Sequence, residues 1–346
     1  MKKLFLMSAA ALTVFAACTK NEVVNIPDSK ISFNSPVVAA ATKANVKNQE
    51  IGTTYDINEN FIVSAWSYEN TAGNAWAGVT EENLYMDKVT CSYSTNDNGW
   101  VPVGRTYYWP KDYYLAFAAV SPVDVEDLVS YSNDGLTITN FTTPDAGQMY
   151  DLMYSDITNK INANNSSNKY DGVDTKFNHA LSSIVVSVKY AEEYNTDDDE
   201  VIEVTDIKFT GVKDKATFKQ NYGSTPAWTI ANGANDVEYS PLSDEQLAAI
   251  NANAKTVQTN ALLLIPQSLN NIKLEVTYTI KGETELENNF EIGLDGEYKN
   301  GEDKVTVNNW EPGKRYVYNI VIGLDKIQFA PSVNNWVEYS KDIAVQ

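Results

Sequence analysis

Cys18 offers the clearest chemistry in the sequence, because its thiol directly follows an apolar run that ends in small residues. Met1–Lys3 carries the positive charge that opens a secretory signal, Leu4–Ala17 is apolar, and the residues after Cys18 turn polar. At about 1.5 Å per residue, the apolar run is shorter than the roughly 30 Å hydrocarbon core of a bilayer. It is therefore too short for a stable membrane span and is typical of a cleaved signal.

Signal peptides with a cysteine in this place are usually cut just before the thiol, after diacylglycerol has been joined to it. The sequence therefore predicts a lipoprotein signal peptide at residues 1–17 and a mature chain that begins at acylated Cys18. Two or three acyl chains on one residue give durable anchoring, so outer-membrane lipid is the first expected partner. An ordinary signal peptide with an incidental cysteine is the alternative.

Elsewhere the sequence lacks the patterns that catalysis or metal binding needs. His179 is the only histidine, so neither the usual zinc ligand set nor a Ser-His-Asp arrangement has a recognisable basis, and a structural hydrogen bond is the expected role. There is no Gly-rich phosphate loop and no nucleophile elbow. The acidic stretches Asp197–Glu200 and Asp295–Glu297 do not follow the spacing of calcium loops. We predict no enzyme activity, no cofactor and no metal site, with a hydrolase that uses two unrecognised carboxylates as the least favoured hypothesis.

Charge and cysteine content limit the partners and the source of stability. The formal net charge is −20, and such a field repels phosphate backbones, so no nucleic-acid partner is expected. Once Cys18 is acylated, only Cys91 is left, which excludes an intramolecular disulfide. Packing and strand pairing must therefore stabilise the fold.

Period-two alternation dominates the sequence and predicts an all-β protein. It is clear at 184–190, 271–280 and 315–324, and Asn-Gly or Asp-Gly pairs suited to tight turns separate such runs. These pairs are Asn98-Gly99, Asp134-Gly135, Asp171-Gly172, Asn232-Gly233, Asp295-Gly296 and Asn300-Gly301. One short helix is expected at 241–250, where Ser243 and Gln246 form a capping-box pair. A polar segment at 159–174 predicts a long exposed loop or a boundary between two antiparallel β-sandwiches.

Four tryptophans in the first half could either fill a core or stack on sugar rings. Burial is the commoner fate of aromatic residues that alternate along strands, so a core role is favoured and glycan binding is the alternative. The four are Trp66, Trp76, Trp100 and Trp109.

Several stretches, taken in order, resemble the fimbrillin-like family, the lipoprotein subunits of type V pili and related surface adhesins. They begin with Phe33 and Thr42–Ala44, and they continue at Phe61–Trp66, Tyr108–Pro122, Asp151–Ser155, Phe177–Ser182, Leu262–Gln267, Trp310–Tyr318 and Ile327–Trp336. The resemblance implies two tandem transthyretin-like β-sandwich domains. It places a lipid-anchored segment with a removable strand at 18–45, an N-terminal sandwich at 46–175, and a C-terminal sandwich with a donor tail at 176–346.

The resemblance also implies a structural subunit or adhesin at the cell surface, anchored in the outer membrane or built into a fimbrium. Its partners would be other fimbrial subunits, joined by strand exchange, together with host or bacterial surface ligands. In the family a protease removes the first strand after an arginine, but here the expected region offers Lys43 followed by Ala44, and Arg105 and Arg315 are the only arginines. The implied donor strand is the tail, with Val337, Tyr339, Ile343 and Val345. A non-polymerising surface lipoprotein that binds glycans is the alternative.

Overall fold

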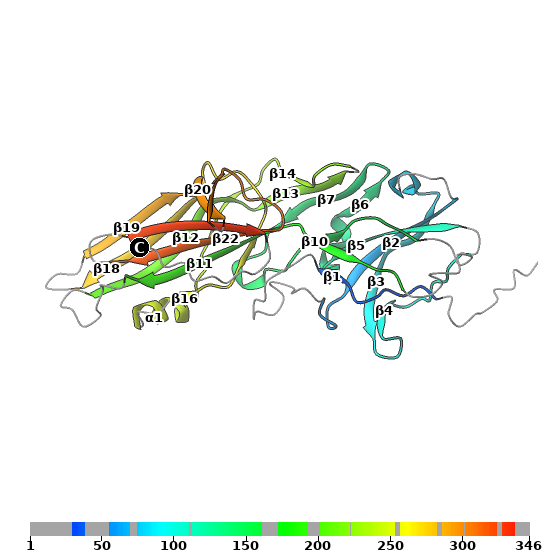
Figure 1. Ribbon diagram of the computed structural model, residues 1–346, viewed down its shortest axis with the longest axis horizontal. Helices are drawn as coiled ribbons and strands as arrows, with labels where there is room; N and C mark the ends of the chain where they lie inside the picture. The colour runs from blue at the N-terminus through cyan, green and yellow to red at the C-terminus, as the bar shows by residue number, and fades with distance from the viewer. Residues whose placement is uncertain are drawn as a thin grey trace, which may run out of the picture.

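The computed structural model describes residues 30–38, 55–69, 75–110, 113–160, 172–191, 201–221, 223–252, 257–281, 286–300, 302–323 and 327–335. Over this part the chain is built mainly from β-strands and forms an elongated molecule (Figure 1). One α-helix, α1 (Asp244–Ala252), is described, together with the short 3-10 helices η2 (Ala75–Gly78), η3 (Val123–Leu128) and η4 (Ala146–Gln148). The all-β prediction with one short helix is confirmed.

Two sheets form the N-terminal sandwich, on the right of Figure 1. The order of the larger sheet is β1 (Val37–Val38), β10 (Lys176–His179), β8 (Met153–Ser155), β5 (Tyr114–Ser121), β2 (Phe61–Tyr68), β3 (Leu84–Ser94) and β4 (Gly99–Pro102), and β9 (Thr158–Lys160) also pairs with β5. The order of the smaller sheet is β14 (Ala227–Ile230), β13 (Lys215–Asn221), β7 (Gly135–Thr142) and β6 (Val129–Ser132).

The C-terminal sandwich has the same two-sheet plan. The order of one sheet is β16 (Val257–Gln258), β11 (Ser182–Tyr190), β22 (Lys314–Ile322), β23 (Ile327–Asn335), β20 (Gly296–Asn300) and β21 (Asp303–Val307), with β17 (Leu262–Leu264) also on β11. The order of the other is β15 (Asp236–Tyr239), β12 (Val201–Lys213), β18 (Lys273–Lys281) and β19 (Leu286–Gly293). Most pairs are antiparallel, as predicted, but β1–β10, β11–β22 and β20–β23 are parallel.

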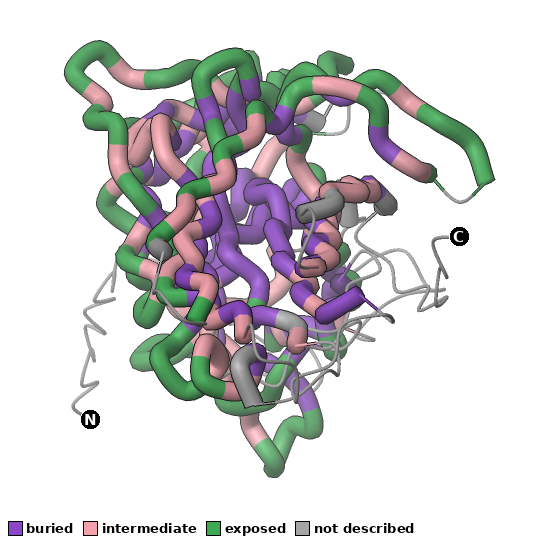
Figure 2. The backbone as a smooth tube through the Cα atoms, turned by 90° about the vertical axis from the view of Figure 1, so that its left-hand side faces the viewer, coloured by how far each residue is buried: buried purple, intermediate pink, exposed green. Residues whose placement is uncertain are grey.

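The strands carry the side-chain pattern that the sequence predicts for a buried core. β5 is almost continuously buried and lies between β2 and β8, because a strand that is apolar on both sides needs a neighbour on each edge and a layer on each face. In β22, alternate residues from Tyr316 to Ile322 are buried. Figure 2 shows buried backbone at the centre and exposed backbone around it.

The two sandwiches share a nearly continuous strand path. β12 belongs to the C-terminal sandwich and β13 to the N-terminal one, and only Asp214 separates them. The Asp214 carbonyl accepts a hydrogen bond from the Thr143 amide at 2.8 Å, and the Asp214 carboxylate accepts one from the Asn235 amide at 2.8 Å. The N-terminal sandwich therefore contains strands from both sides of the predicted boundary at residue 175.

The predicted helix and its cap are present at α1. The Ser243 amide donates to Gln246 Oε1 at 3.0 Å, and the Gln246 amide donates to Ser243 Oγ at 3.3 Å, which is the reciprocal capping box. Ile250, on the inner face of the helix, is 1% exposed. The helix therefore adds to the core and carries no candidate reactive group.

Candidate functional site

The segment Lys30–Val38, called here the N-terminal segment, lies extended across the N-terminal sandwich and pairs with both edges of its larger sheet. At the β4 edge, the Phe33 amide donates to the Trp100 carbonyl at 2.8 Å and the Trp100 amide donates back to the Phe33 carbonyl at 3.0 Å. At the β10 edge, Val37 and Val38 form the parallel strand β1, and the Val37 amide donates to the Thr175 carbonyl at 2.9 Å.

The residues just before β10 bind the middle of the N-terminal segment. The Val173 amide donates to the Ser32 carbonyl at 2.8 Å, and the Asn34 amide donates to the Val173 carbonyl at 3.0 Å. The Asn34 side chain adds a hydrogen bond from its Nδ2 to the Asp174 carboxylate at 2.7 Å. The segment is thus held by backbone pairing on both sides, in a register that one side-chain contact reinforces.

Side chains of the N-terminal segment alternate between the core and the solvent, with one shift of phase. Ile31, Phe33, Pro36 and Val38 are buried, whereas Asn34, Ser35 and Val37 are exposed. The phase shifts at Asn34 and Ser35, where two successive residues face out. The segment therefore presents an apolar pattern with buried residues at spacings of two, three and two.

Phe33 is the largest buried side chain of the segment, at 1% exposure. Its ring makes edge contacts with Phe61 at a centroid distance of 5.9 Å and with Phe117 at 5.7 Å. Tyr55, Trp100 and Phe177 complete the aromatic cluster around Phe61. Edge-to-face pairs of this kind contribute about 0.5–1.5 kcal/mol each beyond the burial of their area.

The surface that the N-terminal segment covers, called here the seat, consists of β4, residues 172–175, β10 and the aromatic cluster around Phe61. Two glycines let the backbone of the segment lie close to this seat. A Cβ atom on Gly99 would lie 2.9 Å from the Phe33 carbonyl oxygen, and one on Gly172 would lie 2.3 Å from Asn34 Oδ1. Gly172 also has a φ of +81°, which residues with a side chain rarely adopt. The sequence indicated both glycines only as turn residues, and their contact with the segment is a finding of the structure.

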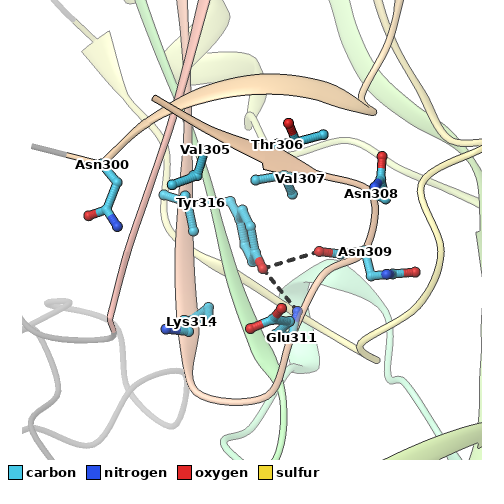
Figure 3. Close-up of a pocket in the computed structure, with 10 residues that line it drawn as sticks. Asn300, Val305, Thr306, Val307, Asn308, Asn309, Glu311, Lys314 and Tyr316 are labelled. Atoms are coloured by element: carbon cyan, nitrogen blue, oxygen red, sulfur yellow. Dashed lines mark hydrogen bonds between the residues drawn. The ribbon is translucent and has the colours of Figure 1, made fainter. Parts of the chain in front are cut away.

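A second candidate site is a cavity of about 310 Å³ beside the β20–β21 hairpin, shown in Figure 3. Three asparagines line it with Glu311, Lys314 and the Tyr316 ring. The Tyr316 hydroxyl accepts a hydrogen bond from the Glu311 amide at 3.0 Å and donates one to the Asn309 carbonyl at 3.3 Å. Because this hydroxyl already bonds the turn that precedes β22 on both sides, its role is to stabilise that turn.

His179 occupies a structural position, as the sequence predicts. It is buried at the end of β10, and its Nδ1 lies 2.6 Å from Asp151 Oδ2, which accepts the hydrogen bond. Across the described residues there is no group of three or more His, Cys, Asp or Glu side chains that could hold a metal ion. In the same ranges, none of the helices has the length and apolarity that a membrane crossing requires.

The tryptophans of the first half are mostly core residues. Trp66, Trp76 and Trp100 are 3%, 4% and 1% exposed, and Trp109 is half-buried against the core. The favoured hypothesis of burial is confirmed for these side chains. None of the first three has a free face on which a sugar ring could stack from the bulk solvent.

The remaining residues singled out in the sequence lie outside the described ranges. These are the lipidation residue Cys18, the processing residues Lys43 and Ala44, and the donor-tail residues Val337, Tyr339, Ile343 and Val345. Their roles stay predictions. Of the candidate removable segment 18–45, the structure describes Lys30–Val38, and this part fills the seat described above.

Comparison with solved structures shows the same fold in fimbrial and cell-adhesion proteins of Bacteroides. A fimbrial protein from Bacteroides vulgatus aligns with a TM-score of 0.56 and 19% identity, covering 89% of this chain and 100% of that one. A candidate cell-adhesion protein from Bacteroides uniformis aligns with a TM-score of 0.50 and 15% identity, over 90% and 99% of the two chains. One from Bacteroides ovatus gives a TM-score of 0.51 and 12% identity, over 90% and 99%.

Sequence comparison gives the family directly. No curated protein matches the chain. The pattern of the fimbrillin-like family matches residues 42–336, which includes both sandwiches and most of the chain. By this match, the chain belongs to the fimbrillin-like family.

Proposed function

We propose that the protein is a structural subunit of a cell-surface fimbria, exported as a lipoprotein on Cys18 and assembled by strand exchange at the seat of the N-terminal segment. The family and the fold of its fimbrial relatives support a surface, non-enzymatic role. The observation that carries the proposal is that one short segment, close to the predicted processing residue Lys43, hydrogen-bonds to both edges of the larger sheet.

Removal of the N-terminal segment would leave a vacant seat of defined shape. The backbone groups of Trp100, Val173 and Thr175 would lose their partners, and the pockets of Ile31, Phe33 and Val38 would open. Full burial of each such side chain contributes about 1.5–3 kcal/mol, so the vacant seat is energetically costly until another strand fills it. Unpaired edges of this kind accept an incoming strand by adding a ladder of hydrogen bonds.

The chain contains a second segment with a matching sequence. Lys30-Ile31-Ser32-Phe33 and Lys326-Ile327-Gln328-Phe329 share Lys, Ile and Phe at the same spacing, and a Pro-Ser or Ser-Pro pair and a valine follow in both. Phe329 is only partly buried on β23, where its ring stacks on Tyr318 at 5.7 Å, whereas Phe33 is fully buried. A segment of this pattern therefore has the residues to fill a vacant seat on a second copy, where its phenylalanine would be fully buried, although β23 would first have to leave its pairing with β22.

The donor is accordingly drawn from the C-terminal end of a neighbouring copy. β23 supplies the matching pattern, and the tail with Val337, Tyr339, Ile343 and Val345 is the other candidate. Pro331 in β23 has no backbone N–H to donate. A strand tolerates this where one of its edges is weakly paired, and β23 pairs with β20 at a single residue pair.

For the test, a protease recognition site is introduced after Lys43 in the full chain, and the chain is cleaved there. The released amino-terminal piece, which contains residues 30–38, is then removed in mild denaturant. A labelled peptide of residues 30–38 should rebind stoichiometrically, and a peptide of 326–335 or 337–346 should compete if it is the donor. A peptide of 30–38 with Phe33 replaced by Ser is the matched control. Failure of the 30–38 peptide to bind the cleaved chain would contradict the proposed seat, and failure of both C-terminal peptides would contradict the proposed donor.

A further inference from the structure

The geometry points to a second site on the N-terminal sandwich: the cavity between the β2–β3 pair and the edge strand β6 binds one or two units of a neutral saccharide. The cavity has a volume of about 540 Å³, within the roughly 300–1,000 Å³ of small-ligand sites. β2, β3 and β6 all lie in the right-hand half of Figure 1. The seat of the N-terminal segment, at β4 and β10, includes none of the residues that line this cavity, so this inference holds whether or not the subunit polymerises.

An irregularity of the sheet forms the floor of the cavity. The β2–β3 register shifts between Val63 and Ala65 and again between Ala65 and Trp66. Opposite this point, Lys88 has a φ of +43°, and its amide donates to Ser64 Oγ at 3.0 Å instead of to a backbone carbonyl. Bulges of this kind bend a strand away from its neighbours and are common beside binding sites. A non-glycine residue with positive φ is uncommon and marks a local conformation held by its surroundings.

Two aromatic residues form the inner wall. The rings of Trp66 and Tyr131 lie edge to face at a centroid distance of 5.0 Å, and both residues line the cavity. The Tyr131 hydroxyl is buried and has no hydrogen-bond partner among the described residues. Buried hydroxyls nearly always have a hydrogen-bond partner, so we expect a polar group of a ligand or an ordered water to bind this oxygen. Leu84 adds an apolar rim and is 41% exposed.

The charges around the cavity select the class of ligand. Glu81 and Asp87 are exposed at its edge, and Ser130, Ser132 and Asn133 supply further acceptors and donors from β6 and the turn after it. Lys88, the one cation among the described residues of the lining, directs its ammonium group to the Glu126 carbonyl at 3.3 Å. Carboxylates beside hydroxyl and amide groups suit the hydroxyls of a sugar, while the partly exposed Tyr131 and the exposed Leu84 suit its apolar faces, with Trp66 buried behind Tyr131. Two carboxylates in a chain of net charge −20 disfavour sialylated or sulfated sugars.

The test exposes the full chain, in detergent, to immobilised neutral oligosaccharides of mannose, galactose and N-acetylglucosamine and to their sialylated and sulfated counterparts. The best neutral trisaccharide is then titrated by calorimetry. Asp87→Asn and Tyr131→Phe should each weaken binding at least tenfold, whereas Asp295→Asn, an exposed change on the other sandwich, should leave it unchanged. Because Tyr131→Phe removes only an unpaired hydroxyl, its melting temperature should not fall.

Each contrary outcome overturns a stated part of the inference. Absence of saturable binding to every neutral probe overturns the site. Binding that Asp87→Asn and Tyr131→Phe leave intact places the saccharide elsewhere and overturns the assignment to this cavity. Tighter binding of the sialylated or sulfated probes overturns the neutral class.

Discussion

The substitution Phe33→Ala tests whether the side chains of the N-terminal segment are part of the hydrophobic core of the N-terminal sandwich. Phe33 is 1% exposed and makes two edge contacts, with Phe61 and Phe117. Burial of a Phe side chain contributes about 1.5–3 kcal/mol, and each edge contact adds about 0.5–1.5 kcal/mol. With the cavity left behind, the free energy of unfolding of the N-terminal sandwich should fall by about 3–5 kcal/mol.

Equilibrium urea unfolding of the full chain, followed by tryptophan fluorescence, measures this loss. Trp100, one of seven tryptophans, contacts both the backbone of Phe33 and the aromatic cluster, so part of the fluorescence change comes from the seat. The midpoint should move to lower urea while the slope is unchanged, because the surface exposed on unfolding stays nearly the same. Val37→Ala is the matched control, since this neighbouring side chain is 56% exposed and should cost less than about 0.5 kcal/mol.

A loss below about 1 kcal/mol for Phe33→Ala would refute the reasoning, because a side chain buried in that seat must cost more. Equal losses for Phe33→Ala and Val37→Ala would show that the segment contributes through its backbone alone. Either result would also remove the energetic basis for exchange of this strand.

Three further predictions test other parts of the structure. Burial raises the pKa of Tyr239 to about 12, whereas an unfolded tyrosine has a pKa near 10, so the folded state keeps this proton at a pH where the unfolded chain loses it. The stability that this difference contributes should be complete below about pH 10 and should be lost as the pH rises towards 12. Melting temperature measured against pH, together with tyrosinate absorbance, checks this. A chain ending at residue 191 lacks β13 and β14 and should show no cooperative melting transition; a sharp transition would mean that the first half folds without them. Replacing Lys43 with Arg should speed cleavage of the precursor by an arginine-specific protease at least tenfold, measured by intact mass over time, and equal rates for both chains would place processing elsewhere.

The strand pattern of this protein was largely readable from the sequence. The alternation at 184–190, 271–280 and 315–324 corresponds to β11, β18 and β22, and the capping pair at Ser243 and Gln246 begins α1. These features depend on contacts between residues close in sequence, and the period of a strand or the reach of a cap is set locally. The apolar run between Pro110 and Pro122 contains the central strand β5.

The seat of the N-terminal segment was only partly readable. Phe33 belongs to the stretch that suggested an amino-terminal strand, and its burial agrees with that hypothesis. The phase shift at Asn34 and Ser35 hides the alternation, because no single period fits residues on both sides of it. Gly99 follows Asn98 and Gly172 follows Asp171, so the sequence predicts an ordinary turn at each. No residue near either glycine in the sequence indicates that another segment lies against it.

By itself, the sequence determined the all-β class and the turns, and it contains no recognisable catalytic motif, while the lipoprotein leader stays a prediction. Tertiary structure alone decided which strands are neighbours, including the pairing of β13 with β7 from the other side of the predicted boundary and the closure of both sheet edges by Lys30–Val38. The physical reason is that alternation specifies which face of a strand is buried but not which strand lies beside it. That choice depends on packing between residues far apart in the chain, where shape and hydrogen-bond register are settled together.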